Sequence, residues 1–389
     1  EAHQYLEEAL ALLDKLDNPS VIAYVLHSKG LLAQLMGDDA SGVEYLSRAR
    51  DLAETHRLPL QLSFHLMSLA HTYLKQGRVE ESVAHYEEAI ELSRRSRYAD
   101  GLAKSLRVFG DVLTNLNRFD EALPYLEEAA DCFHRLEDGK SEADTLIKIA
   151  SIHEARKNAS EAEMIWQRIA GLLGLLDSYY ELSAVEAFGR IARMRGNVQE
   201  ALSHYLDAVE LSVRAGEVER EGRLRNIAGI IEWQRGEFGE ALLQYRKALE
   251  LFDRCGDAAA AGLMLNSIGV TLQKLGKCEE SIHHLRDALE VHEESGRRQL
   301  KAHALSALGD SYMAIDRHDD AKQAYADSLQ IRWDINDRRG EGWMLHHLAV
   351  AHAAQGEMDR SRDYARQAEV VGHEVQDQKL LDACRKLLD

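Results

Sequence analysis

The sequence predicts an all-α protein built from repeated pairs of antiparallel helices, and three observations support this prediction. Similar sequence segments recur along the chain, for example GRVEESVAHYEEAIELSRRSR at 77–97, GNVQEALSHYLDAVELSVRAGE at 196–217 and GEFGEALLQYRKALELFDRCGD at 236–257. The 389 residues include only three prolines and are rich in Ala, Leu, Glu and Arg, which are strong helix formers. Segments that read as strands are absent from the sequence.

A small residue recurs every 40 residues, with one step of 39, and marks the first helix of each unit. Seven residues later stands a residue that we expect to leave this helix with a positive φ, often glycine. The small position holds Gly30, Ala70, Gly110, Ala150, Gly189, Gly229, Gly269, Gly309 and Ala349. The turn position holds Gly37, Gly77, Asn117, Lys157, Gly196, Gly236, Gly276, Asp316 and Gly356.

The second helix of each unit begins after this turn and carries its own small residue five positions further on. Small residues let two helices approach closely, and the large residue one turn later fills the space beside the contact. The sixth unit, for example, should hold helices at about 218–235 and 239–255. The small residues are Gly42, Ser82, Ala122, Ala162, Ala201, Ala241, Ser281, Ala321 and Ser361, and the large ones include Tyr86, Leu126, Trp166, Tyr205, Tyr245, Leu285 and Tyr325.

The ends of the units carry helix-capping signals. A unit closes with a glycine at 216, 256 or 296, and Pro19 and Pro59 occupy the first turn of a helix, where proline is tolerated. Short polar side chains stand where the next helix needs an N-cap, and these are Asn18, Asp138, Asp177, Asp257 and Asp337. One unit cannot bury its own apolar face, so the units must stack.

This pattern resembles the tetratricopeptide repeat (TPR) over essentially the whole chain. The usual repeat has about 34 residues, so a 40-residue unit resembles the long subgroup of kinesin light chains, spindle adaptors and bacterial signalling sensors. We expect one solenoid over 1–389, with half repeats at 1–16 and 377–389, as in a piece of a longer protein. The nine full repeats are predicted at 17–56, 57–96, 97–136, 137–175, 176–215, 216–255, 256–295, 296–335 and 336–376.

The resemblance implies a right-handed superhelix whose first helices line a concave, peptide-binding groove. The groove positions lie −6, −3, +1, +4 and +5 residues from the small residue of each first helix. They are apolar and aromatic in the first two units and rich in Arg, Asn and Gln in the middle. The candidate groove residues are Tyr24, His27, Phe64, Met67, His71, Lys104, Arg107, Asn115, Arg190, Arg193, Arg223, Asn226, Trp233, Asn266, Gln273, Lys274, Trp343 and His346.

The groove positions of all nine units hold seven basic and five acidic residues, whereas the whole chain has a net charge of −19. This contrast favours a protein or peptide partner that carries acidic and apolar residues. The alternative is that these polar side chains are merely solvated or pair between neighbouring repeats, as Arg190 could with Glu154. The acidic chain argues against nucleic acid and against an anionic membrane as partners.

The sequence offers no sign of catalysis, a cofactor or a metal site. HExxH, GxSxG, Walker and GxGxxG motifs are all absent, so we expect no enzyme activity and no catalytic residues. The four cysteines stand at wide spacings without a CxxC pair. Two groups of histidines, His346 with His347 and His352, and His283 with His284, could suggest a metal, but the members of a group do not share one helix face.

Two departures from the repeat leave alternatives open. Arg225 and Glu232 occupy mostly apolar positions of the sixth unit, so they either form a partly buried pair or reflect a rotated helix. The 39-residue step coincides with Gly171 and Gly174, so the segment 169–182 is either a flexible, apolar site of self-association or a packed helix end.

Two functions follow as hypotheses for a chain with no signal segment and no apolar run long enough to span a membrane. The first is a cytoplasmic protein- or peptide-binding scaffold. The second is the ligand-sensing region of a multidomain signalling protein, such as a nucleotide cyclase, a transcription regulator or a signalling ATPase.

Overall fold

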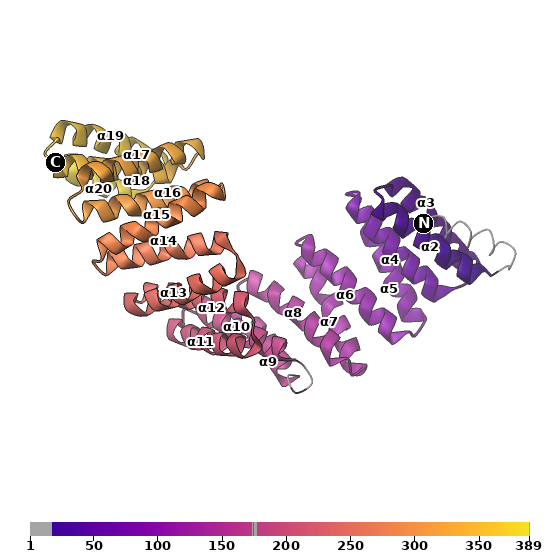
Figure 1. Cartoon of the computed structure of the whole chain (residues 1–389). Helices are drawn as coiled ribbons and strands as arrows, with labels where there is room; N and C mark the ends of the chain where they lie inside the picture. Colours follow the sequence, from indigo (N-terminus) through magenta and orange to yellow (C-terminus); the bar gives the residue numbers. More distant parts are fainter. Residues whose placement is uncertain (1–17, 173, 175–176, 389) are drawn as a thin grey trace. The chain divides into compact units, whose positions relative to one another are not determined.

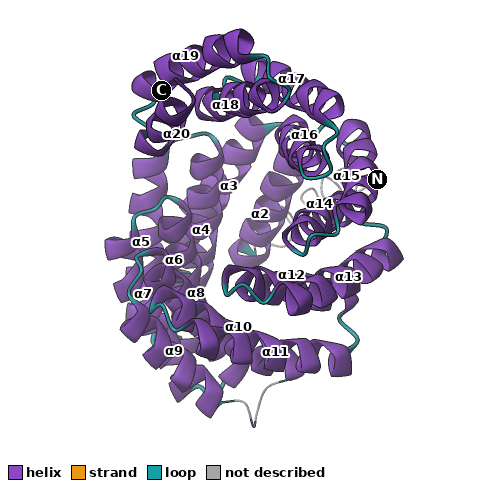
Figure 2. Ribbon diagram, turned by 90° about the vertical axis from the view of Figure 1, so that its left-hand side faces the viewer, coloured by secondary structure: helices purple, strands orange, loops and turns teal. Residues whose placement is uncertain are grey.

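The structure of the protein is a computed structural model that describes residues 18–172, 174 and 177–388 (Figure 1). All regular secondary structure in these ranges is helical, as Figure 2 shows by its colours. The chain forms two compact units, Glu1–Arg195 and Gly196–Asp389. The predicted all-α fold of consecutive helix pairs, a TPR-like solenoid, is therefore confirmed, whereas the repeat boundaries and the single domain stay predictions.

Unit 1 contains a series of helices, most of which have 17 residues, and neighbours in sequence pack against each other. The predicted half repeat at 1–16 lies outside the described residues. The helices of unit 1 are α2 (Pro19–Leu35), α3 (Asp39–Thr55), α4 (Pro59–Lys75), α5 (Val79–Arg95), α6 (Ala99–Asn115), α7 (Phe119–Arg135), α8 (Gly139–Ala155), α9 (Ala159–Gly171) and α10 (Ser178–Met194).

Unit 2 continues the same alternation of first and second helices. The helices predicted at 218–235 and 239–255 agree with α12 and α13 to within one residue at each end. The helices of unit 2 are α11 (Val198–Ala215), α12 (Val218–Gln234), α13 (Phe238–Cys255), α14 (Ala258–Lys274), α15 (Cys278–Glu294), α16 (Arg298–Met313), α17 (His318–Asp334), α18 (Arg338–Ala354), α19 (Met358–Glu374) and α20 (Gln378–Leu388).

The predicted turn inside each repeat is confirmed at all nine positions, where φ lies between 58° and 83°. Six of these residues are glycines, which adopt a positive φ without strain, and three are Asn117, Lys157 and Asp316. The turn between repeats also takes a positive φ, but glycine occupies only some of its positions. Sequence reasoning therefore missed the turns at Arg57, Arg97, Glu137, Asn336 and Gln376.

The predicted helix N-caps are confirmed by side-chain hydrogen bonds. The caps are Asn18, Asp138, Asp177, Asp257 and Asp337, and each side chain accepts from a backbone N–H in the first turn of its helix. Pro19 and Pro59 are the first residues of α2 and α4. The capping side chains favour a helix start at these positions, because they satisfy N–H groups that have no partner inside the helix.

Close packing of the two helices in a repeat depends on the small residue of the first helix. A Cβ atom at Gly229 would lie 2.7 Å from Cε1 of Tyr245, and one at Gly309 would lie 2.4 Å from Cε1 of Tyr325. The large residue of the second helix therefore rests directly on the backbone of the first. The small residue of the second helix, such as Ala241, is fully buried. Stacked repeats then bury apolar clusters, among them one between Ala70 and Ile191 in unit 1 and two in unit 2, between Ala241 and Leu272 and between Ile282 and Cys384.

Of the two alternatives for Arg225 and Glu232, the partly buried pair is not formed. Arg225 donates from Nε to Oε1 of Glu221 at 2.7 Å and from Nη1 to Oε1 of Gln244 at 3.2 Å. Glu221 lies one helical turn away from Arg225, whereas Glu232 lies two turns away, so the nearer carboxylate takes the guanidinium. Oε2 of Glu232 is buried with no hydrogen-bond partner, and burial raises the pKa of this carboxyl.

The connection between α9 and α10 is longer than the other connections, because α9 ends early. α9 ends at Gly171 after 13 residues, and α10 begins at Ser178. Residues 173, 175 and 176 lie outside the described part of the chain, so self-association through 169–182 stays a prediction. No helix within the described ranges is long and apolar enough to cross a membrane.

Candidate functional site

The predicted groove residues lie on the first helices of the repeats, and all except His27 reach solvent at least in part. In unit 1 the first helices are α2, α4, α6, α8 and α10, and in unit 2 they are α12, α14, α16 and α18. Some first helices of neighbouring repeats within a unit touch, as α2 touches α4, α6 touches α8 and α14 touches α16. We call the exposed side of these helices the first-helix face of each unit.

The apolar end of the first-helix face of unit 1 contains half-exposed aromatic side chains. Tyr24 is 59% exposed and Phe64 is 49% exposed. His27 does not line this surface, because its ring is buried beneath Phe64 at a centroid distance of 4.4 Å. Its Nδ1 lies 2.9 Å from Nδ1 of the buried His65, and burial lowers the pKa of both histidines to about 4.

Polar side chains on the first-helix face of unit 1 connect successive repeats. Arg190 donates from Nε to Oε2 of Glu154 at 2.7 Å, so the pairing that we considered as an alternative to binding is present. The same Glu154 accepts a bond from Nε1 of Trp166 at 2.9 Å. Similar contacts join every neighbouring pair of first helices in this unit, through Gln61–Ser20, Gln34–Thr72, Ser105–Met67, Lys148–Asp111 and Tyr180–Asp144.

The predicted positive charge of the groove is partly neutralised inside the protein. Lys104 pairs with Asp100 at 2.8 Å, and Arg223 pairs with Glu219. With Arg190, three of the seven basic groove residues are therefore ion-paired within their own unit. Arg193 is exposed and forms no ion pair with another described residue. Asp100 and Glu219, which lie one turn before Lys104 and Arg223 on the same helices, are outside the five groove positions.

The first-helix face of unit 2 contains polar side chains on α12 and α14 that have no hydrogen-bond or ion-pair partner within the described residues. The side chains of Asn226, Asn266, Gln273 and Lys274 make no hydrogen bond or ion pair with any residue in the described ranges. Oδ1 of Asn266 is buried and unpaired. Trp233 stands beside these residues, with its ring packed edge-on against Phe238 at 5.8 Å. Such amides could pair with a peptide backbone.

The last predicted groove residues, Trp343 and His346, lie where α18 meets α20. Trp343 donates from Nε1 to Oδ2 of Asp377 at 3.2 Å, and Arg339 donates to the same oxygen at 2.8 Å. Burial lowers the pKa of His346 to about 4. This end of the face therefore anchors α20, for which Asp377 is the N-cap.

A partly buried network that was not predicted from the sequence lies next to this end. Asp310 accepts a bond from the Tyr325 hydroxyl at 2.6 Å and lies 3.4 Å from Nδ1 of His347. Burial, and then the neighbouring carboxylate, raise the pKa of Tyr325. Within the described part of the chain, no group of three or more His, Cys, Asp or Glu residues could hold a metal ion. The four cysteines are free thiols.

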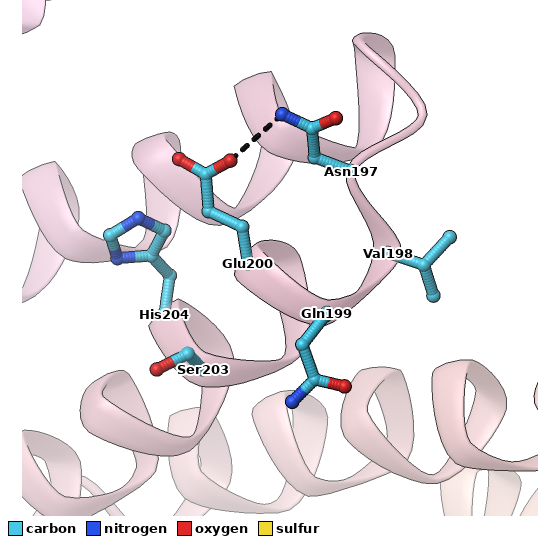
Figure 3. A pocket seen from close by; sticks show the side chains of 6 residues that line it. All are labelled: Asn197, Val198, Gln199, Glu200, Ser203 and His204. Carbon is cyan, nitrogen blue, oxygen red and sulfur yellow. Dashed lines mark hydrogen bonds between the residues drawn. The ribbon is translucent and has the colours of Figure 1, made fainter.

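A hollow of about 660 Å³ lies over the first turns of α11, a second helix, and so outside the first-helix face. Figure 3 shows its side chains, in which the amide of Asn197 donates to Glu200 at 2.9 Å. None of the predicted groove residues lines it. The lining residues are Asn197, Val198, Gln199, Glu200, Ser203 and His204.

Comparison with known families identifies the class of protein that this architecture represents. The model of the MalT-like TPR region matches residues 1–231, which is more than half of the chain, and a tetratricopeptide-repeat model matches residues 260–334. The chain therefore belongs to the MalT-like TPR family of tetratricopeptide-repeat proteins. A comparison with curated protein sequences found no significant match.

Solved structures share the fold at low sequence identity. RapI in its apo form is 14% identical, with a TM-score of 0.59 over 72% of this chain and 79% of that chain. A signal transduction ATPase (STAND) protein with a TPR sensor from Pyrococcus horikoshii is 16% identical, with a TM-score of 0.61. That match covers 96% of this chain but 55% of the STAND protein. Aspartyl phosphate phosphatase F from Bacillus subtilis is 12% identical, with a TM-score of 0.53 over 90% and 94%.

Proposed function

We propose that this chain is a non-catalytic scaffold that binds an extended polypeptide segment along the first-helix face of unit 2. The observation that supports this proposal best is the row of Asn226, Asn266, Gln273 and Lys274, whose side chains have no partner among the described residues. A buried amide oxygen without a hydrogen bond, such as Oδ1 of Asn266, destabilises the free protein by roughly 1 to 3 kcal/mol. A backbone N–H of a bound segment would satisfy it.

The chemistry of this row defines the segment that it would take. An Asn or Gln side chain offers both a donor and an acceptor, which matches the peptide group of an extended chain. Asn226 and Asn266 occupy the same position of consecutive repeats, so they could contact successive peptide groups of one segment. Lys274 would favour a carboxylate near one end of the contact. No step of this binding requires a cofactor or a metal.

Selection of random displayed peptides on the immobilised protein tests the proposal. We expect it to recover peptides whose affinity falls about 10- to 30-fold for the double variant Asn226→Ala and Asn266→Ala, since each lost hydrogen bond is worth about 1 kcal/mol. The control is Gln199→Ala, which removes an exposed amide from the hollow on α11 (Figure 3). Failure to recover any peptide, or equal affinity for the double variant, would reject the proposal.

A second candidate is the sensor region of a larger signalling protein. The likeness to the STAND protein favours it, because the TPR part of that protein is a sensor and this chain spans about half of its length. The coding sequence on either side of these 389 residues tests this candidate. A nucleotide-cyclase, DNA-binding or ATPase domain encoded in the same reading frame would favour the sensor role, and a reading frame without one would favour a free-standing scaffold.

A further inference from the structure

A pocket of about 280 Å³ opens on the first-helix face of unit 1, between α4 and α6. Its walls are the apolar side chains of Leu60, Phe64 and Met67 from α4, and of Tyr98 just before α6. Leu60 is 51% exposed, Phe64 is 49% exposed and Tyr98 is 47% exposed. Exposure of large apolar side chains to water is unfavourable, and a cluster of them on a surface marks a site where a partner binds.

The floor of the pocket contains serine hydroxyls whose hydrogen bonds are already formed within the protein. Oγ of Ser63 lies 2.9 Å from the carbonyl oxygen of Ala89 and 2.8 Å from Oγ of Ser93, which itself donates to Ala89 at 2.9 Å. Ser105 donates to the carbonyl oxygen of Gly101 at 2.8 Å. These hydroxyls therefore offer little to a polar ligand, and burial of an apolar group is the interaction that the pocket favours.

One wall of the pocket is shaped by a glycine. A Cβ atom at Gly101 would lie 2.2 Å from Cδ1 of Tyr98, so the tyrosine ring can lie against the first turn of α6 only because position 101 has no side chain. The Tyr98 hydroxyl donates to Oδ2 of Asp100 at 3.1 Å, which holds the ring in this place. Any side chain at Gly101 would displace the wall.

The side of the pocket that faces along α6 is basic. Lys104 lines the pocket, and its side chain is 58% exposed although it pairs with Asp100. Arg107 follows one turn later, and its Nε is buried without a hydrogen-bond partner. A carboxylate that approaches these two residues would complete the hydrogen bonds of the guanidinium and gain attraction from both charges.

We propose that this pocket, the α4–α6 pocket, holds one aromatic or branched aliphatic side chain of a bound polypeptide, and that a neighbouring carboxylate of the same polypeptide contacts Lys104 and Arg107. The proposal rests on the proposed function, in which the ligand is a polypeptide segment, and extends it to the first-helix face of unit 1. Pockets for whole small-molecule ligands usually have volumes of about 300 to 1,000 Å³. A volume of about 280 Å³ with apolar walls suits a single side chain better.

Methyl NMR on the whole chain tests the pocket without knowledge of the partner. The protein is labelled with ¹³C at its methionine methyl groups, and the Met67 signal is assigned by its loss in Met67→Leu. The probes are N-acetyl-tryptophanamide, N-acetyl-leucinamide and, as a control, N-acetyl-glycinamide. We expect the first two to shift the Met67 signal saturably and the glycine compound to leave it in place. No shift, or an equal shift with all three, would overturn the proposal.

Two variants and one control make this test specific. Leu60→Glu places a charge in the apolar wall near the N-terminus of α4, where Glu is compatible with the helix. Gly101→Ala favours the helix but displaces Tyr98. We expect each to weaken the N-acetyl-tryptophanamide titration at least fivefold. Leu243→Glu, at a 46% exposed leucine of α13, should change nothing. Unchanged titrations in both pocket variants would overturn the proposal.

The displayed peptides separate the two proposals. Peptides that bind the wild-type protein and lose at least tenfold in affinity for Leu60→Glu support the pocket. If every recovered peptide binds Leu60→Glu normally, the pocket is overturned and the proposed function stays intact. If no peptide is recovered, the proposed function fails, and the methyl titration alone then decides whether the pocket takes an apolar side chain.

Discussion

The first-helix faces of the two units use similar polar residues in different ways. In unit 1, Arg190 reaches Glu154 in the preceding repeat, and further contacts join each first helix to the next. In unit 2, Asn226 and Asn266 stand at the same position of consecutive repeats without a partner in the described part of the chain. Several polar residues of unit 1 thus connect repeats, whereas these two asparagines of α12 and α14 make no such contact within the described residues.

The type of residue at a groove position therefore does not by itself indicate that this residue binds a partner. Arg190 and Arg223 occupy groove positions in units 1 and 2, yet Arg190 bonds a partly buried carboxylate of another repeat and Arg223 pairs with Glu219 on its own helix. The structural surroundings decide whether a guanidinium stabilises stacking or is exposed to a partner. Three predictions test this contrast between the units.

The largest expected effect concerns pH and the buried histidines of unit 1. The pKa of His27 and of His65 is about 4 in the folded protein and about 6.5 in an unfolded chain, so the unfolded state takes up protons first as the pH falls. Their stabilising contribution is complete above about pH 6.5 and is lost as the pH falls towards 4, by up to about 3 kcal/mol per histidine. The protection of the α2 and α4 amides against hydrogen exchange, taken relative to the intrinsic rate at each pH, should therefore fall at about pH 5.

The double variant His27→Leu and His65→Leu provides the control, because it removes both titrating groups and keeps the site apolar. The protection of α2 and α4 should then depend much less on pH, while that of α12 and α14 should match the wild-type protein. The same pH dependence in the variant would show that other groups in unit 1 dominate its acid sensitivity.

The second prediction asks whether the two units unfold separately. Ala122 and Ala241 are fully buried small residues at the same position of second helices, one in each unit. Ala122→Leu and Ala241→Leu should each force a helix pair apart and destabilise that unit by about 1 to 3 kcal/mol. Hydrogen exchange measured by mass spectrometry should accelerate in the unit that carries the change. Equal acceleration in both units would mean that the chain unfolds as one cooperative body.

The smallest expected effect compares two arginines. Arg190→Ala should lower the free energy of unfolding by about 1 kcal/mol, because Glu154 is only 15% exposed and loses its charged partner. Arg223→Ala should change it by less than about 0.5 kcal/mol, because its pair with Glu219 is exposed and lies within one helix. Urea unfolding of both variants measures the difference. Equal effects would contradict the distinction between a connecting and an exposed arginine.

Sequence reasoning located the helices because their limits depend on local chemistry. A positive φ favours glycine, an unpaired N–H at a helix start favours Asn or Asp, and a close helix contact favours a small residue. Each requirement leaves a mark at one position, such as Gly236, Asp257 or Ala241. Reasoning from glycine failed at Arg57 and Arg97, because the turn between repeats imposes a positive φ that residues with side chains also adopt there.

The candidate site was less predictable from the sequence, because contacts between repeats determine which of its side chains are exposed and which are paired. The candidate groove residues reach solvent at least in part except for His27, whose ring packs against His65 and Phe64 from the next repeat, and their role in binding stays a prediction. The position of Arg225 beside Glu221 and Gln244 was also missed. Long polar side chains have several partners within reach, and their spacing in the sequence does not say which one they take.

The sequence by itself determined the all-α fold, the 40-residue period and the turns within the repeats, since each follows from a backbone or packing requirement that recurs within one unit. The tertiary contacts, in contrast, determine which polar side chains of the first-helix face connect repeats and which make no hydrogen bond or ion pair within the described residues. The tertiary structure also revealed the α4–α6 pocket, where Tyr98 lies against Gly101. These features arise between repeats, where the identity of the neighbouring side chain, rather than the repeat pattern, sets the energy.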